Sequence, residues 1–192
     1  MFKFNRVISL ALMYGLFLFG FAWFLFNGLD LIIWSTLALF ALGLVIYVLI
    51  DKLELNENYK IFVGLAVWLN ALAYAYFYQR YLYAGYPIHF VDSILITFIV
   101  YDYFKKNLKV EGVQLFICTF LTLIGIVSMW EIYEYLTGII LHIKIQGIFV
   151  LGNALVRPID DTMWDIIIGG LGSLLTLISR EIVPGFNRKS QS

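Results

Sequence analysis

Charged residues are scarce in this sequence: Asp, Glu, Lys and Arg make up 14% of its 192 residues, against about 25% in soluble domains. Hydrophobic residues account for 62%, and the mean hydropathy is +0.88. So few polar side chains cannot cover an exterior that faces water, which excludes a soluble globular protein and makes the lipid bilayer the main solvent. The composition predicts an all-α, polytopic transmembrane helical bundle that forms a single domain over residues 1–192.

An excess of charge of one sign is also lacking. Lys plus Arg and Asp plus Glu both number 13, so the formal net charge is +0, and the basic residues form no phosphate-binding stripe. Nucleic acid is therefore not an expected partner. A single cysteine, Cys118, excludes a disulfide framework and a cysteine-based metal site, and its apolar surroundings favour a packed thiol over a nucleophile.

Long hydrophobic runs are present instead, and six of them are long enough to cross the bilayer, which takes about 20 residues. We expect spans at residues 7–27, 29–50, 61–83, 88–104, 113–137 and 161–179. The long connection at residues 138–160 mixes apolar residues with polar ones. This mixture predicts an outer interfacial segment or a re-entrant loop rather than a seventh span. Its polar residues include His142, Lys144, Gln146 and Asn153.

The distribution of basic residues predicts the orientation, because cytoplasmic loops carry an excess of Lys and Arg. With both termini inside, ten of the basic residues lie on the inner side: Lys3, Arg6, Lys52, Lys60, Lys105, Lys106, Lys109, Arg180, Arg188 and Lys189. The outer side keeps three, Arg80, Lys144 and Arg157. We therefore expect a multi-pass protein of the cell membrane with an inner N-terminus and an inner C-terminus.

Ionisable residues gather at the outer ends of three predicted spans. They form pairs spaced three or four residues apart, so that both members of a pair share one helix face. The pairs are His89 and Asp92, Glu131 and Glu134, and Asp161 and Asp165. Ionisable side chains within spans usually face a cavity or each other, so we expect the three helices to bring these side chains into a common site.

Glycines support this convergence. Gly169 and Gly172 continue the face of Asp161 and Asp165 along the last predicted span. Small residues permit close approach of helices in a membrane, so this acidic face is expected to be packed inside the bundle rather than exposed to lipid.

The chemistry of the candidate site follows from its carboxylates. So many acids cannot all stay ionised and unpaired in an apolar setting, so they must share protons or bind a cation. Oxygen ligands with one imidazole suit a divalent ion such as Mg²⁺, Mn²⁺, Ca²⁺ or Zn²⁺. The candidate metal ligands are Asp92, Glu131, Glu134, Asp161 and Asp165. Together with His89, as general base or further ligand, they are the candidate catalytic residues, and Arg80 and Arg157 are candidates for binding an anionic substrate.

Simpler roles compete for several of these residues. The whole cluster could be a structural polar network that ties helix ends together near the lipid head groups. His89 alone could be an interfacial histidine hydrogen-bonded to Asp92. Asp160 is better explained as the N-cap of the last span than as a catalytic group. Asp102, near the inner end of its span, is expected to pair with Lys105 or Lys106.

The second half of the chain, at residues 74–175, resembles the YjdF-like (DUF2238) membrane proteins. The resemblance rests on three motifs: His89-Phe90 at the start of a span, Trp130-Glu131-Ile132-Tyr133-Glu134-Tyr135 at the end of one, and Asp161-Thr162-Met163-Trp164-Asp165 followed by glycines. The order Glu131, Arg157, Asp161, Asp165, Gly169 is more distantly similar to that of VanZ-like proteins. Both resemblances imply a fold of several spans, and neither implies a particular activity.

Three classes of function are compatible with the sequence. The first is an enzyme at the outer leaflet that uses a metal ion or acid–base groups to act on a lipid or a polyprenyl-linked head group. The second is a cation- or proton-coupled transporter or small-molecule binder, which predicts further polar residues toward the inner face. The third is a non-catalytic membrane scaffold.

Overall fold

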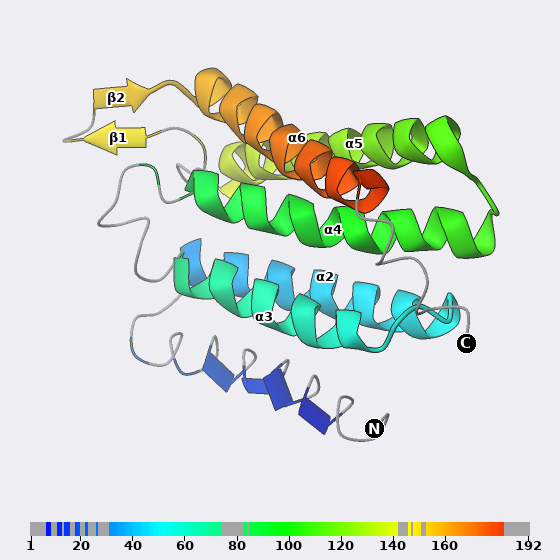
Figure 1. Cartoon of the computed structure of the whole chain (residues 1–192). Helices are drawn as coiled ribbons and strands as arrows, with labels where there is room; N and C mark the ends of the chain where they lie inside the picture. The colour runs from blue at the N-terminus through cyan, green and yellow to red at the C-terminus, as the bar shows by residue number, and fades with distance from the viewer. Residues whose placement is uncertain are drawn as a thin grey trace. The chain divides into compact units, whose positions relative to one another are not determined.

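The computed structural model describes residues 7–8, 11–12, 14–15, 18–19, 22, 26, 31–73, 83, 85–141, 146, 148–150 and 153–182. These residues are mainly helical, and the chain divides into two compact units, Met1–Ile88 and His89–Ser192, each of which is described by itself (Figure 1). The elements are α2 (Leu31–Lys52), α3 (Asn58–Leu72), α4 (Gly85–Asn107), α5 (Gly112–Leu141), β1 (Ile148–Val150), β2 (Asn153–Val156) and α6 (Pro158–Ile182). The first predicted span, at residues 7–27, lies largely outside the described residues.

In the first unit, α2 and α3 are joined at a buried lysine. The side chain of Lys60 is 1% exposed, and its ammonium forms ion pairs with Asp51 at the end of α2 and, at 2.9 Å, with Glu57. The same ammonium lies 4.4 Å from the ring centroid of Tyr47. Burial alone would lower the pKa of Lys60, but its hydrogen bonds to the two carboxylates outweigh that effect and raise the pKa above 10.5.

In the second unit, three helices are long and apolar enough to cross a membrane, at Gly85–Asn107, Gly112–Ile140 and Pro158–Glu181. They include the predicted spans 88–104, 113–137 and 161–179. Large apolar side chains on them are exposed, among them Leu121 and Leu175, which is expected of surfaces that face lipid. These helices confirm the predicted apolar helices in this half of the chain, while the total of six spans and the inner termini stay predictions.

Two glycines set the distance between α4 and α6. A Cβ atom on Gly169 would lie 2.8 Å from Ser93 Oγ, and one on Gly172 would lie 2.6 Å from the backbone oxygen of Phe90. A larger residue at position 172 would require a shift of a helix, because the obstacle there is backbone, whereas at position 169 the Ser93 side chain would have to move. The structure therefore confirms the prediction that these glycines allow close packing of the helices.

At the end of the unit where α4 and α6 finish, an ion pair joins the same two helices. Arg180 Nη1 donates to Asp102 Oδ1 at 2.7 Å, and the guanidinium stacks on the rings of Phe98 and Tyr101. The Tyr101 hydroxyl lies 3.3 Å from Glu181 Oε1. The sequence predicted that Asp102 pairs with Lys105 or Lys106, which are close to it in the chain. It did not predict Arg180, which comes from another helix.

A short hairpin occupies part of the predicted outer loop. Strands β1 and β2 pair antiparallel, with Phe149 opposite Ala154 and Val150 opposite Asn153. The expectation of an interfacial or re-entrant loop over residues 138–160 did not include these strands, and α5 also extends beyond its predicted end to Leu141. The hairpin lies beside the end of the bundle where α4 and α6 begin and α5 ends (Figure 1). We call this the hairpin end.

Cys118 is exposed on α5, so the expectation of a packed thiol is wrong. The apolar run around it lies in a helix long and apolar enough to cross a membrane, and in such a helix an apolar neighbourhood in sequence does not distinguish the outward-facing side from the interior.

Candidate metal centre at the hairpin end

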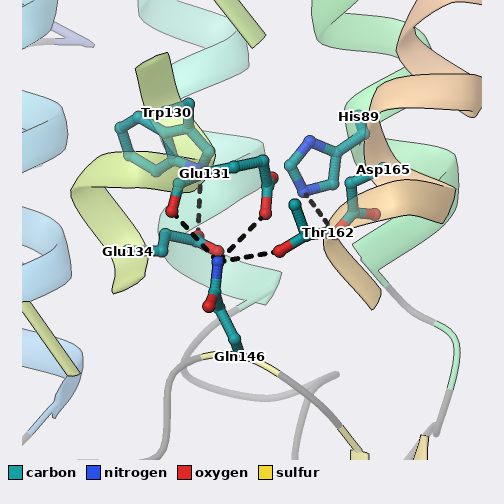
Figure 2. A network of polar contacts seen from close by, with 7 residues as sticks. All are labelled: His89, Trp130, Glu131, Glu134, Gln146, Thr162 and Asp165. Carbon is teal, nitrogen blue, oxygen red and sulfur yellow. Dashed lines mark hydrogen bonds and ion pairs between the residues drawn. The ribbon is translucent and has the colours of Figure 1, made fainter. Parts of the chain in front are cut away.

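Three side chains from three helices converge near the hairpin end. His89 comes from α4, Glu131 from α5 and Asp165 from α6, and one potential ligand atom from each lies within 4.8 Å of the other two (Figure 2). The residues Glu131 and Asp165 are 3% and 4% exposed, and the side chain of His89 is 15% exposed. The sequence proposed all three as site residues, and the structure places them together.

Close contacts of Gly169 with the neighbouring helices hold these three side chains near one another. Gly169 lies one turn after Asp165, and Ser93 lies one turn after His89, so the contact between Gly169 and Ser93 sets the level at which the imidazole faces the carboxylate. A Cβ atom on Gly169 would also approach Val127, one turn before Glu131, at 3.2 Å. Close packing at one glycine thus fixes the spacing of all three groups.

The distance between His89 and Asp165 is informative. His89 Nε2 lies 3.7 Å from Asp165 Oδ2, whereas an N–H···O hydrogen bond is about 2.7–3.2 Å long. Two ligands of the same ion, at bond lengths of roughly 2.0–2.4 Å, stand about 3–4.8 Å apart, depending on the angle between them. The spacing is therefore too wide for a direct hydrogen bond and suits an ion held between the two groups.

Two carboxylate oxygens of the set have no hydrogen-bond donor among the described residues. Glu131 Oε1 and Asp165 Oδ1 are both buried, and neither accepts a hydrogen bond from any residue that the structure describes. A buried charged group without a partner costs several kcal/mol unless it is protonated or paired with a cation. Two carboxylates supply the two negative charges that would balance one divalent ion.

The other oxygen of Glu131 is held by a residue that the sequence did not single out as part of the site. Gln146 Nε2 lies 3.0 Å from the backbone oxygen of Glu131, 3.3 Å from Glu131 Oε2 and 2.9 Å from Thr162 Oγ1. Figure 2 shows the Gln146 side chain reaching from its loop toward α5 and α6. In the sequence, the only signal for a contact between Gln146 and the site was its polarity within an apolar loop, because Glu131 and Thr162 are distant from it in the chain.

The remaining predicted ligands surround this set. Glu134 is buried, and its Oε1 accepts a hydrogen bond from Trp130 Nε1 at 2.9 Å, one turn earlier on α5. Asp161 is half-buried one turn before Asp165, and the charges of Asp161, Glu131 and Glu134 all act on Asp165. Asp92 is half-buried on α4. Their roles as ligands or catalytic groups stay predictions.

Of the two candidate substrate-binding arginines, the structure describes only Arg157. Arg157 is exposed and forms a two-point ion pair with Asp160, at 2.7 and 2.9 Å, which raises the pKa of the guanidinium. Asp160 lies inside the first turn of α6, which begins at Pro158, so its predicted place as N-cap is wrong. A proline suits the first position of a helix because it has no N–H to satisfy.

The other candidate arginine, Arg80, lies outside the described residues, as do His142 and Lys144 of the outer loop.

Comparison with known proteins gives one family. The family model described as "Predicted membrane protein (DUF2238)" matches residues 9–184, which include every residue of the candidate metal centre. The match confirms the resemblance seen in the sequence motifs, while the similarity to VanZ-like proteins stays a prediction. Neither the curated proteins nor the solved structures include a significant match to the chain.

Proposed function

We propose that this protein, which belongs to the DUF2238 family of predicted membrane proteins, is a membrane-embedded enzyme that uses one divalent metal ion. The ion would be held by His89, Glu131 and Asp165 at the hairpin end. Its substrate would be an amphiphile, a lipid or polyprenyl-linked molecule whose head group reaches the site from the membrane.

The observation that carries this proposal is the set of ligand atoms from three helices within 4.8 Å, two of them on nearly fully buried carboxylates. A structural polar network would be expected to use up its buried oxygens in hydrogen bonds. Here Glu131 Oε1 and Asp165 Oδ1 accept none from the described residues. The arrangement is better explained by a cation than by cross-linking of helices.

Three protein ligands favour catalysis over a purely structural ion. Structural zinc sites are usually closed by four protein ligands, whereas catalytic sites keep a position open for water or substrate. A divalent ion in such a position polarises phosphoryl or carbonyl oxygens and lowers the pKa of bound water. Glu134 and Asp161, whose charges act on Asp165, would accept and return protons.

The depth of the site supports an amphiphilic substrate. His89 and Asp165 lie about 6 and 10 Å from the starts of α4 and α6, at 1.5 Å per residue, and Glu131 lies about 15 Å from the end of α5. Groups at these depths are within reach of a head group whose chain stays in the hydrocarbon. With the termini inside, as the basic residues predict, the site belongs to the outer leaflet of the cell membrane.

The orientation has its own test. Starting from a Cys118→Ser parent, single cysteines at Asn56 and Ala154 would be labelled in intact cells with a membrane-impermeant maleimide. The proposed six-span arrangement with inner termini predicts labelling at position 154 and protection at position 56. The reverse pattern, or labelling at both, contradicts it.

The test of the metal centre is binding of Mn²⁺ to the purified protein, followed by electron paramagnetic resonance. We expect one ion per chain, with affinity lowered at least about 100-fold in His89→Ala, Glu131→Gln and Asp165→Asn. Asp160→Asn is the matched control, because Asp160 is an exposed acid of the same helix that pairs with Arg157. A wild-type protein that binds no more Mn²⁺ than the triple variant contradicts the proposal.

Buried hydroxyl groups favour a second candidate, a cation-coupled transporter. Five of them continue from the site along the interior faces of the three helices: Ser93, Thr97, Thr119, Ser173 and Thr176. Such a transporter needs polar groups along its path. Uptake of Mn²⁺ into proteoliposomes that depends on Asp165 would favour transport, whereas metal-dependent turnover of lipid head groups without uptake favours the enzyme.

A further inference from the structure

We infer that Gln146 is a positioning residue of the metal centre: it fixes the carboxylate of Glu131 so that Oε1 is presented to the ion. The inference rests on the proposed metal site and adds to it a residue outside the ligand set. It is carried by the contacts that Gln146 makes with α5 and α6 (Figure 2).

The contacts fix which end of the amide faces the site. Three oxygen acceptors surround Gln146 Nε2, namely the Glu131 backbone oxygen, Glu131 Oε2 and Thr162 Oγ1. An amide oxygen in the same place would face the oxygens of Glu131 and be repelled, so the NH₂ group must point inward. The amide carries two N–H groups, which are shared among these three acceptors.

The effect on Glu131 is directional. Gln146 engages Oε2 and the backbone oxygen of the same residue, so the carboxylate is held relative to its own helix. The same amide nitrogen donates to the Thr162 hydroxyl of α6 at 2.9 Å, which holds the amide in place beside the carboxylate. The buried Oε1 accepts no hydrogen bond from the described residues and stays available to a ligand.

The neutrality of the Gln146 amide matters for metal binding. A Lys or Arg at position 146 would neutralise Glu131 and compete with the ion. A neutral amide orients the carboxylate while leaving its negative charge for the metal. Hydrogen-bond partners that orient metal ligands typically change metal affinity by about 10–100-fold when they are removed.

The inference is tested with Gln146→Met, which keeps the length of the side chain and removes its donors. We expect Mn²⁺ affinity to fall about 10–100-fold, with little change in the unfolding temperature of the metal-free protein. Gln114→Met is the matched control, because Gln114 is exposed near the start of α5, far along the helix from Glu131. Thr162→Val removes the hydroxyl that accepts from the Gln146 amide, and in the same measurement it is expected to weaken binding to a smaller extent.

A positioning role also predicts dependence on Glu131. In a Glu131→Gln background the residual affinity comes from the other ligands, and adding Gln146→Met is expected to change it less than twofold. If wild-type protein binds Mn²⁺ and Gln146→Met binds it as Gln114→Met does, the inference is overturned and the metal centre stands. If the loss persists unchanged in the Glu131→Gln background, Gln146 does not act through Glu131. If wild-type protein binds no ion, the metal centre and this inference both fall.

Discussion

Gly172 of α6 lies directly against the backbone of Phe90 in α4, so that a Cβ atom at position 172 would be 2.6 Å from the Phe90 carbonyl oxygen. A backbone oxygen cannot turn aside as a flexible side chain can, so any larger residue must push the helices apart. The two helices that meet there also carry His89 and Asp165. Helix packing and the geometry of the candidate metal centre are therefore linked.

Gly172→Ala is expected to lower the free energy of unfolding by about 1–3 kcal/mol, because overpacking shifts backbone. Mn²⁺ affinity should fall with it, since the shift separates His89 from Asp165. Thermal unfolding in detergent and Mn²⁺ titration check the two effects. The control is Gly125→Ala on α5, where an added Cβ meets nothing within 4 Å. Equal unfolding temperatures for the two variants would show that the close contact does not limit packing.

Asp102 and Arg180 should show strong coupling at the other end of the same helix pair. Arg180 is 11% exposed and pairs with Asp102 at 2.7 Å, so Arg180→Met leaves a partly buried carboxylate without this partner. We expect each of Arg180→Met and Asp102→Asn to cost about 1–3 kcal/mol of stability, and the double variant to cost less than their sum. A double-mutant cycle of unfolding free energies measures this, and additive effects would contradict the coupling.

Much of the helical framework could be predicted from sequence because it depends on local composition. The runs at residues 88–104, 113–137 and 161–179 all lie within helices of the structure. His89, Glu131 and Asp165 were found for a related reason, since an ionisable residue inside an apolar run is costly unless it faces the protein interior. These signals need no knowledge of which helices touch.

The remaining features depend on contacts between distant segments. Gln146 has its partners on two helices, and Arg180 reaches Asp102 across the bundle. No spacing rule connects such residues. The hairpin is different, because Ile148 to Val150 are β-branched or aromatic and Leu151-Gly152 separates them from the second strand. A two-residue connection with glycine between such runs is a hairpin signal that could have been used.

Asp165→Asn should have opposite effects with and without metal. Asp165 Oδ1 is buried and accepts no hydrogen bond from the described residues, so removing the charge is expected to stabilise the metal-free protein by about 1–3 kcal/mol. If the proposed ion binds wild-type protein, then at 100 times its dissociation constant it is expected to add about 2.7 kcal/mol. The variant should lose that gain.

Unfolding temperatures with Mn²⁺ and with a chelator check both effects of Asp165→Asn. Asp160→Asn serves as the control and should respond to metal as the wild-type protein does. A variant that is destabilised without metal, yet still stabilised by Mn²⁺, would show that Asp165 has a structural role and is not a ligand.

The buried ammonium of Lys60 should give the first unit a stability that depends on alkaline pH. Its pKa is raised in the folded protein because hydrogen bonds to Asp51 and Glu57 outweigh the effect of burial. A group whose pKa is higher when folded contributes its full stabilisation below the unfolded value of 10.5, and this contribution is lost as pH rises through the folded-state pKa. Stability should therefore fall from about pH 10 upward, in part because Lys60 loses its proton.

Lys60→Met separates this effect from other groups that titrate at alkaline pH. It should lower stability at neutral pH by about 1–3 kcal/mol, since two carboxylates lose a charged partner, and it should flatten the decline above pH 10. Lys52→Met, at an exposed position near the end of α2, should keep the wild-type profile. Unfolding temperatures from pH 7 to 11 provide the comparison. If Lys60→Met and wild-type protein lose stability in parallel above pH 10, the ammonium of Lys60 is not what joins α2 to α3, and the ion pairs with Asp51 and Glu57 contribute little to the fold.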